Sequence, residues 1–238
     1  MQIVIPYTPR KLQAKLHADL DSHRWGVIVC HRRMGKTVMA INHLLRAAVL
    51  CERPSPRYAY LAPTYRQAKA VAWDYLKQFA SKIPGTKFHE TELRCDLPNG
   101  ARISLLGAEN PDSLRGIYLD GCFMDEVADM PESVFPEIIR PALSDRKGWC
   151  FFVGTPKGQN AFYEMYEQAG ISEGWYTAIC KASETGKLDH EELTSAREAM
   201  TADQYAQEYE CSWVANVPGA IFGKEMQAAL EEGRIGRV

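Results

Sequence analysis

The chain has 238 residues, of which 46% are hydrophobic and 24% charged, so it is long enough for one sizeable domain with a buried core. A formal net charge of −2 gives no overall attraction to nucleic acid, so any such contact must come from a local basic patch. Seven scattered cysteines without Cys-x-x-Cys spacing argue against a disulfide framework and a structural zinc site. With no stretch resembling a membrane span or a signal peptide, we expect a soluble intracellular protein.

Short apolar strands alternate with amphipathic helices, which is typical of an α/β fold with a parallel sheet. We expect strands, in chain order, over residues 26–30, 57–62, 93–97, 101–105, 116–124, 149–153 and 175–181. We expect helices over residues 36–51, 65–82, 131–143, 160–169, 189–200, 202–211 and 224–232. Asn99-Gly100 between two alternating runs predicts a hairpin turn, because both residues tolerate a positive φ.

The segment Cys30–Thr37, CHRRMGKT, follows an expected strand and opens an expected helix. Its end matches a phosphate-binding loop, in which backbone N–H groups surround the phosphates and Gly35 lets the backbone approach closely. Lys36 would reach the β- and γ-phosphates, and the Thr37 hydroxyl would ligate Mg²⁺. The loop pattern asks for glycine where Cys30 stands, so an ordinary strand-to-helix turn remains the alternative.

A second motif is the acidic pair Asp125-Glu126 at the end of an apolar strand. In a nucleotide-hydrolysing enzyme, Asp125 would hold Mg²⁺ and Glu126 would orient and deprotonate the attacking water. The alternative is a helix N-terminus that attracts carboxylates through its dipole. A third motif, Gly154-Thr155-Pro156, ends the next buried strand, where Thr155 could hydrogen-bond the γ-phosphate; alone it would pass for an ordinary turn.

Together these motifs resemble the ATPase domain of the large terminase subunit of tailed bacteriophages, the motor that packages DNA into the capsid. The matching segments span roughly residues 1–215 and are Pro6–Pro9 with Gln13, Arg32–Thr37, Ala59–Ala68, Leu114–Gly116 with Asp125-Glu126, and Gly154–Pro156. The resemblance implies a P-loop NTPase fold of the ASCE/RecA-like type, a mainly parallel sheet flanked by helices. It implies an ATPase core over 1–170, a C-terminal lid subdomain over 171–216, and a linker over 217–238 toward a nuclease domain.

The resemblance also implies roles for the loop and the coupling motif. ATP would be bound by the loop residues Arg32, Arg33, Met34, Gly35, Lys36 and Thr37. Arg32 would sense or stabilise the γ-phosphate, with Arg33 as its competitor for this role. Thr155 would couple hydrolysis to motion.

Three further residues carry roles that the resemblance implies. Gln13 and Tyr7 would contact adenine, although Tyr7 could equally be a packed aromatic residue. Arg115 is either an arginine supplied in trans to a neighbouring subunit or a surface arginine that anchors the turn before Gly116.

The implied activity is Mg²⁺-dependent ATP hydrolysis that drives double-stranded DNA into the procapsid in the host cytoplasm, without DNA cleavage by this chain. The implied partners are the portal protein, the small terminase subunit and further copies of the chain in a pentameric ring, with no membrane; the isolated domain could be monomeric. Two other functions remain open. One is a helicase-like nucleic-acid-remodelling ATPase, and the other is a nucleotide-binding module that does not hydrolyse.

Overall fold

The computed structural model describes residues 4–214, 229, 232 and 234. Within them, one sheet contains eight strands in the order β3-β4-β5-β2-β6-β7-β1-β8. The strands are β1 (Trp25–Cys30), β2 (Arg57–Ala62), β3 (Lys87–His89), β4 (Arg94–Asp96), β5 (Arg102–Gly107), β6 (Gly121–Asp125), β7 (Trp149–Gly154) and β8 (Trp175–Cys180). Neighbours from β5 to β8 pair in parallel, and β3, β4 and β5 pair antiparallel. This confirms the expected mainly parallel α/β sheet.

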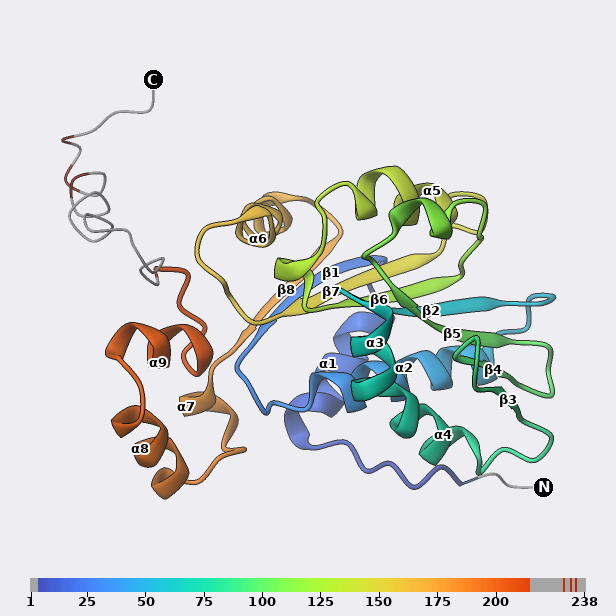
Figure 1. Ribbon diagram of the computed structural model, residues 1–238, viewed down its shortest axis with the longest axis horizontal. Helices are drawn as coiled ribbons and strands as arrows, with labels where there is room; N and C mark the ends of the chain where they lie inside the picture. The colour runs from blue at the N-terminus through green and yellow to red at the C-terminus, as the bar shows by residue number, and fades with distance from the viewer. Residues whose placement is uncertain (1–3, 215–228, 230–231, 233, 235–238) are drawn as a thin grey trace.

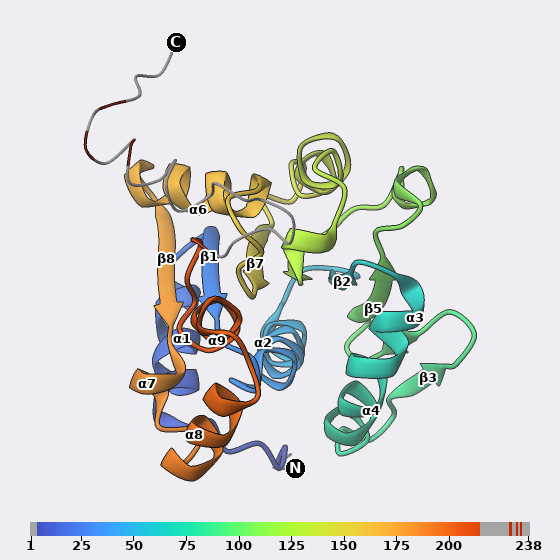
Figure 2. The same ribbon diagram turned by 60° about the vertical axis from the view of Figure 1, so that its left-hand side comes forward.

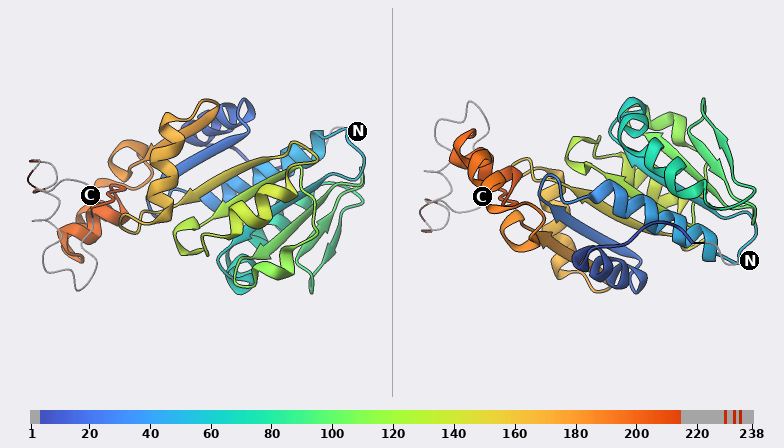
Figure 3. Two further views of the ribbon diagram at one scale, coloured as in Figure 1. Left: turned by 90° about the horizontal axis from the view of Figure 1, so that it is seen from above. Right: turned by 90° about the horizontal axis from the view of Figure 1, so that it is seen from below.

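Helices cover both faces of the sheet, with α1 to α4 on one face and α5 and α6 on the other (Figures 1 and 3). The α-helices are α1 (Lys11–Asp21), α2 (Lys36–Leu50), α3 (Tyr65–Ala68), α4 (Asp74–Ala80), α5 (Arg140–Ala142), α6 (Ala161–Ile171), α7 (Ala182–Thr185), α8 (His190–Glu198) and α9 (Ala202–Glu208). Among the helices of the described residues, none is long and apolar enough to cross a membrane.

The central strands are buried on both faces, which is why they read as continuous apolar runs. In β1 and β2 every residue after the first is buried, and alternate residues of each strand belong to different core clusters. Parallel pairing brings the carboxyl ends of β1, β6 and β7 to one edge of the sheet. The expected phosphate loop, acidic pair and Thr155 follow or end these three strands, so the fold gathers them.

The expected helix over residues 65–82 is one helical segment with an internal π-helical turn, η1 (Lys69–Trp73), between α3 and α4. Similarly, the expected helix over residues 131–143 contains a π-helical segment, η4 (Val134–Ile139), before α5. Asn160 accepts hydrogen bonds from the N–H groups of Phe162 and Tyr163, so it caps α6. Helix α1, strand β3 and helix α7 are elements that the sequence patterns did not predict.

The hairpin at Pro98-Asn99-Gly100 is confirmed, since β4 and β5 pair antiparallel on either side of it. The expected backbone geometry is wrong for Asn99, because Gly100 is the residue that takes a positive φ of 85°. The Asn99 side chain accepts a hydrogen bond from the Ala101 N–H and donates one to the Ala48 carbonyl at the end of α2. The asparagine therefore ties the hairpin to a helix.

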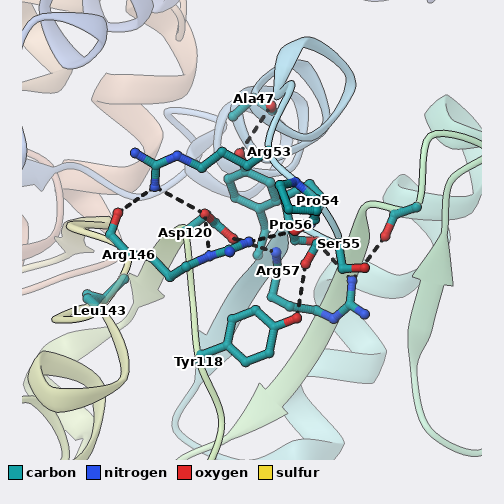
Figure 4. Close-up of polar contacts among 12 residues, drawn as sticks. Ala47, Arg53, Pro54, Ser55, Pro56, Arg57, Tyr118, Asp120, Leu143 and Arg146 are labelled. Carbon is teal, nitrogen blue, oxygen red and sulfur yellow. Dashed lines mark hydrogen bonds and ion pairs between the residues drawn. The ribbon is translucent and has the colours of Figure 1, made fainter.

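The strand expected over residues 116–124 is shorter than predicted, because β6 begins only at Gly121. Gly116 has a φ of 82°, and the preceding loop contains the 3-10 turn η2 (Pro111–Leu114). The chain joins the sheet at Asp120, whose N–H donates to the Arg57 carbonyl and whose buried carboxylate accepts the Arg57 N–H at 2.9 Å. Arginine side chains surround this carboxylate (Figure 4), so the apolar run was mistaken for a longer strand.

After β8 the chain forms α7, α8 and α9, which lie beyond the carboxyl end of that strand (Figure 2). These helices share a small core of their own, with Ala182, Ala196, Tyr205 and Tyr209 buried together. The boundaries 1–170 and 171–216 stay a prediction. The expected linker 217–238, including its helix over 224–232, lies outside the described residues apart from three isolated positions.

Candidate nucleotide site

The phosphate loop begins at Cys30, the last residue of β1, and ends at the N-terminus of α2. Cys30 is fully buried in extended backbone, so the loop makes no demand for glycine at this position. The left-handed conformations occur instead at Arg33, with a φ of 66°, and at Gly35, with a φ of 89°. The missing first glycine is therefore no obstacle to a phosphate loop in this fold.

Gly35 is also the point where the loop is crowded by α1. A Cβ built at Gly35 would lie 2.7 Å from an Arg10 side-chain nitrogen and 3.2 Å from the Gln13 amide nitrogen. Gln13 donates to the Gly35 carbonyl at 3.3 Å, and Arg10 donates to the Met34 carbonyl. The segment before α1 thus holds the loop from outside, with Arg10 as a contributor that sequence reasoning missed.

Lys36 is buried between two of the expected catalytic side chains. Its Nζ lies 3.3 Å from Glu126 Oε1 and donates to Thr155 Oγ1 at 3.2 Å. Burial disfavours the charged form, but the carboxylates of Glu126 and Asp125 outweigh it, so the pKa of Lys36 is raised above its ordinary value. Lys36 is therefore a buried cation at the carboxyl edge of the sheet, which is what binding of a phosphate requires.

Asp125 is buried at the end of β6 and accepts three hydrogen bonds. Its Oδ2 accepts from the Thr37 hydroxyl at 3.3 Å and from the Tyr60 hydroxyl, and its Oδ1 accepts from the Glu126 N–H at 3.0 Å. Burial and the neighbouring Glu126 carboxylate raise the pKa of Asp125, and Lys36 opposes this shift. Tyr60 was not predicted as part of the site, because only the pairing of β2 with β6 reveals its place.

Glu126 has a left-handed backbone, with a φ of 56°, and its side chain is 40% exposed. A non-glycine residue in this conformation is strained, and such residues concentrate at functional sites. Thr155 follows β7, the strand between β6 and β1, and is 4% exposed. The structure therefore brings Lys36, Glu126 and Thr155 together, as the sequence motifs predict.

The two candidate arginines of the loop have different surroundings. Arg32 forms an ion pair with Glu208 of α9, and its N–H donates to the Glu208 carbonyl at 2.9 Å. Arg33 is exposed and takes a left-handed backbone. The contact of Arg32 with α9 links the phosphate loop to the C-terminal helices, a link that the sequence alone could not show.

Two further candidates lie outside this cluster. The Tyr7 hydroxyl hydrogen-bonds His17 Nε2 at 3.0 Å, and its ring packs edge-on against Phe79, so Tyr7 is a packed aromatic residue in this structure. Arg115 is exposed after η2 and forms ion pairs with Asp112 at 2.8 Å and with Glu137 at 3.7 Å. Its contacts are those of a surface arginine on the α5 side of the sheet.

With β7 inserted between the strand of the phosphate loop and the strand of the acidic pair, the domain is a P-loop nucleotide-binding domain of the ASCE class. Residues 28–227 match the family "Terminase large subunit, T4likevirus-type, N-terminal". The chain therefore belongs to the terminase large subunit family, through its N-terminal domain. This identification agrees with the resemblance drawn from the motifs.

Individual relatives agree with the family match. The chain is 30% identical over 193 residues to the terminase large subunit of Thermus virus P23-45, covering 72% of this chain and 39% of that protein. It thus spans well under half the length of this relative. Among solved structures, the large terminase ATPase domain of Thermus phage P74-26 superposes with a TM-score of 0.74 at 25% identity, covering 88% of this chain and 96% of that domain. The large terminase of another thermophilic bacteriophage, solved in complex with ADP, has the same fold, with a TM-score of 0.74 at 18% identity, 87% of this chain and 54% of that one.

Proposed function

We propose that this chain is the ATP-hydrolysing motor domain of a phage terminase large subunit that drives double-stranded DNA into the procapsid. The observation that carries the proposal is the buried Lys36 ammonium held between Glu126 and Thr155, at 3.3 and 3.2 Å. A cation, a base and a threonine meet there at the N-terminus of α2, where backbone N–H groups favour phosphate. The large terminase of the second thermophilic phage has been solved with ADP and with ATP-γ-S, which supports ATP as the nucleotide.

The residues present fit a magnesium ion. Thr37 and Asp125 provide a hydroxyl and a carboxylate that are 3.3 Å apart, and Mg²⁺ prefers such oxygen ligands together with substrate phosphates. Thr37 would ligate the ion directly, and Asp125 would hold it through water. When bound, Mg²⁺ neutralises the charge that develops on the β- and γ-phosphate oxygens.

Lys36 and Glu126 exchange partners in the proposed reaction. When ATP binds, the Lys36 ammonium leaves Glu126 for the β- and γ-phosphate oxygens. The Glu126 carboxylate then accepts a proton from the water that attacks the γ-phosphorus, and the bond between that phosphorus and the bridging oxygen of ADP breaks. The partial exposure of Glu126 leaves room for this water.

The other candidates receive roles beside this exchange. Arg32 would stabilise the γ-phosphate after leaving Glu208, which couples nucleotide binding to α9; Arg33 remains the competing arginine. Thr155 would report hydrolysis through its contact with Lys36. Gln13 would contact adenine from its place beside Gly35.

Two roles from the sequence need residues to act away from their present contacts. Tyr7 would have to leave His17 to contact adenine. Arg115 would act in trans on a neighbouring subunit, for which its exposed position is suitable. We propose a homo-oligomeric ring, expected to be a pentamer, with the portal protein and the small subunit as partners in the host cytoplasm.

The test is ATP hydrolysis by the purified chain, with and without double-stranded DNA, at two protein concentrations. The proposal expects hydrolysis that requires Mg²⁺ and rises with duplex DNA and with concentration, because Arg115 completes a neighbour's site. Stimulation by single-stranded DNA alone would favour a helicase-like enzyme. Nucleotide binding without hydrolysis would favour a non-hydrolysing module. Plasmid DNA should stay intact with Mg²⁺ or Mn²⁺, and cleavage would contradict the absence of nuclease activity from this chain.

A further inference from the structure

Tyr60 reaches the acidic pair from the neighbouring strand. It lies on β2, which pairs in parallel with β6, and its side chain is completely buried. Its hydroxyl donates a hydrogen bond to Asp125 Oδ2. Burial, together with the Asp125 carboxylate, raises the pKa of Tyr60 well above its ordinary value, so the phenol keeps the proton that it donates.

The Asp125 carboxylate depends on such donors for its orientation, because the terminal torsion of an aspartate is broad. The other two donors are the Thr37 hydroxyl and the Glu126 N–H, both from the proposed reaction machinery. Only Tyr60 holds the carboxylate from β2, on the side of β6 that faces away from β7. The carboxylate is thus held between the phosphate loop and a strand that contributes nothing to the loop.

We propose that Tyr60 is a positioning residue of the metal site, whose hydroxyl fixes the Asp125 carboxylate in the orientation that faces Thr37 and the bound nucleotide. The inference rests on the proposed function of Asp125. Without this donor, Asp125 Oδ2 keeps only the 3.3 Å hydrogen bond from Thr37, and the carboxylate can turn away. Residues that orient metal ligands typically change metal affinity by about 10- to 100-fold when they are removed.

The same strand provides a matched control. Tyr58 lies two residues before Tyr60 and therefore on the same face of β2. It is 4% exposed, and its hydroxyl donates to the Ala47 carbonyl of α2 at 3.2 Å. Tyr58→Phe removes a buried phenol hydroxyl from the same strand, as Tyr60→Phe does, but leaves Asp125 untouched.

The experiment measures the dissociation constant of a fluorescent ADP analogue with Mg²⁺ and with EDTA. The ratio of the two constants reports how much the metal strengthens binding. Tyr60→Phe should lower this ratio by about 10-fold or more and leave the constant in EDTA unchanged, because the loop is intact. Tyr58→Phe should leave both constants unchanged.

An unchanged ratio in Tyr60→Phe, in a parent that does show metal-dependent binding, overturns the inference and spares the proposed function. A parent whose affinity ignores Mg²⁺ refutes the metal role of Asp125 and the inference with it. If Tyr60→Phe does not fold, the double variant with Asp125→Asn is compared with Asp125→Asn alone. Equal ratios support positioning through Asp125, and a further fall overturns it.

Discussion

Asp120 should be among the residues whose loss most destabilises the sheet, although it lies at the edge opposite the nucleotide site. Its carboxylate is 4% exposed and accepts hydrogen bonds from Arg57 N at 2.9 Å and from Arg146 Nε at 3.1 Å, with Arg53 at 3.4 Å (Figure 4). It fastens the segment before β2 and the loop before β7 to the start of β6. Asp120→Asn keeps an acceptor for Arg57 but turns an amide N–H toward a guanidinium.

Breaking a buried ion pair by removing one partner costs about 3–5 kcal/mol. Arg146 and Arg53 are 23% and 54% exposed and can regain water, so we expect Asp120→Asn to lower the free energy of unfolding by about 2–3 kcal/mol. For a domain of this size, that corresponds to a fall in Tm of about 5–10 °C.

Thermal and urea unfolding, followed by circular dichroism, measure this loss. The control is Asp74→Asn, which removes a carboxylate that is 92% exposed and lies 3.4 Å from Lys77, and which should leave Tm unchanged. If Asp120→Asn is no less stable than Asp74→Asn, the arginine cluster does not anchor the sheet and the reasoning fails.

Three further predictions concern stability and the loop. Burial lowers the pKa of His17 to about 4 and of His43 to about 3, so the folded chain keeps both neutral while the unfolded chain protonates them near pH 6.5. Stability should therefore be full above about pH 6.5 and fall by about 3–4 kcal/mol between pH 7 and pH 5, measured by urea unfolding. Gly35→Ala should destabilise by about 1–2 kcal/mol and weaken nucleotide binding, since the new Cβ takes a positive φ and meets Arg10. Asn160→Ala should cost about 1 kcal/mol in urea unfolding through loss of the α6 cap.

Each of these has its own control. Replacing His17 and His43 by leucine should flatten the pH dependence, and an unchanged slope would assign it to other groups. Gly100→Ala has a similar positive φ with open space around it, so it should destabilise without affecting nucleotide binding; equal loss of binding in both glycine variants would contradict the loop argument. Asn160→Ser keeps a capping oxygen and should be far milder than Asn160→Ala.

Strands and motifs with strong local patterns were predictable from the sequence. The apolar run Arg57–Ala62, closed by Pro63, predicts β2 with the bounds that the structure gives it. The phosphate loop and the acidic pair were found because each combines an apolar strand with a motif at its end. By contrast, β3 (Lys87–His89) has three residues and no clear alternation, and residues 116–120 form an apolar stretch that buries itself without joining the sheet.

The contacts that complete the site depend on the order of strands, which local patterns do not contain. Tyr60 meets Asp125 only because β2 lies beside β6. Glu208 meets Arg32 across 176 residues of sequence, and Arg10 reaches the Met34 carbonyl from the start of α1. The motifs therefore predicted which residues carry the chemistry, and the fold was needed to show what holds them.

The most direct test of the central claim is steady-state ATP hydrolysis by the purified chain and by its Glu126→Gln and Lys36→Ala variants, with nucleotide affinity measured in parallel. The account predicts Mg²⁺-dependent release of phosphate by the parent. Glu126→Gln should still bind nucleotide but hydrolyse it about 10²- to 10⁴-fold more slowly, because it lacks the base, and Lys36→Ala should lose affinity. Hydrolysis by Glu126→Gln at the parent rate, or unchanged affinity in Lys36→Ala, would contradict the account.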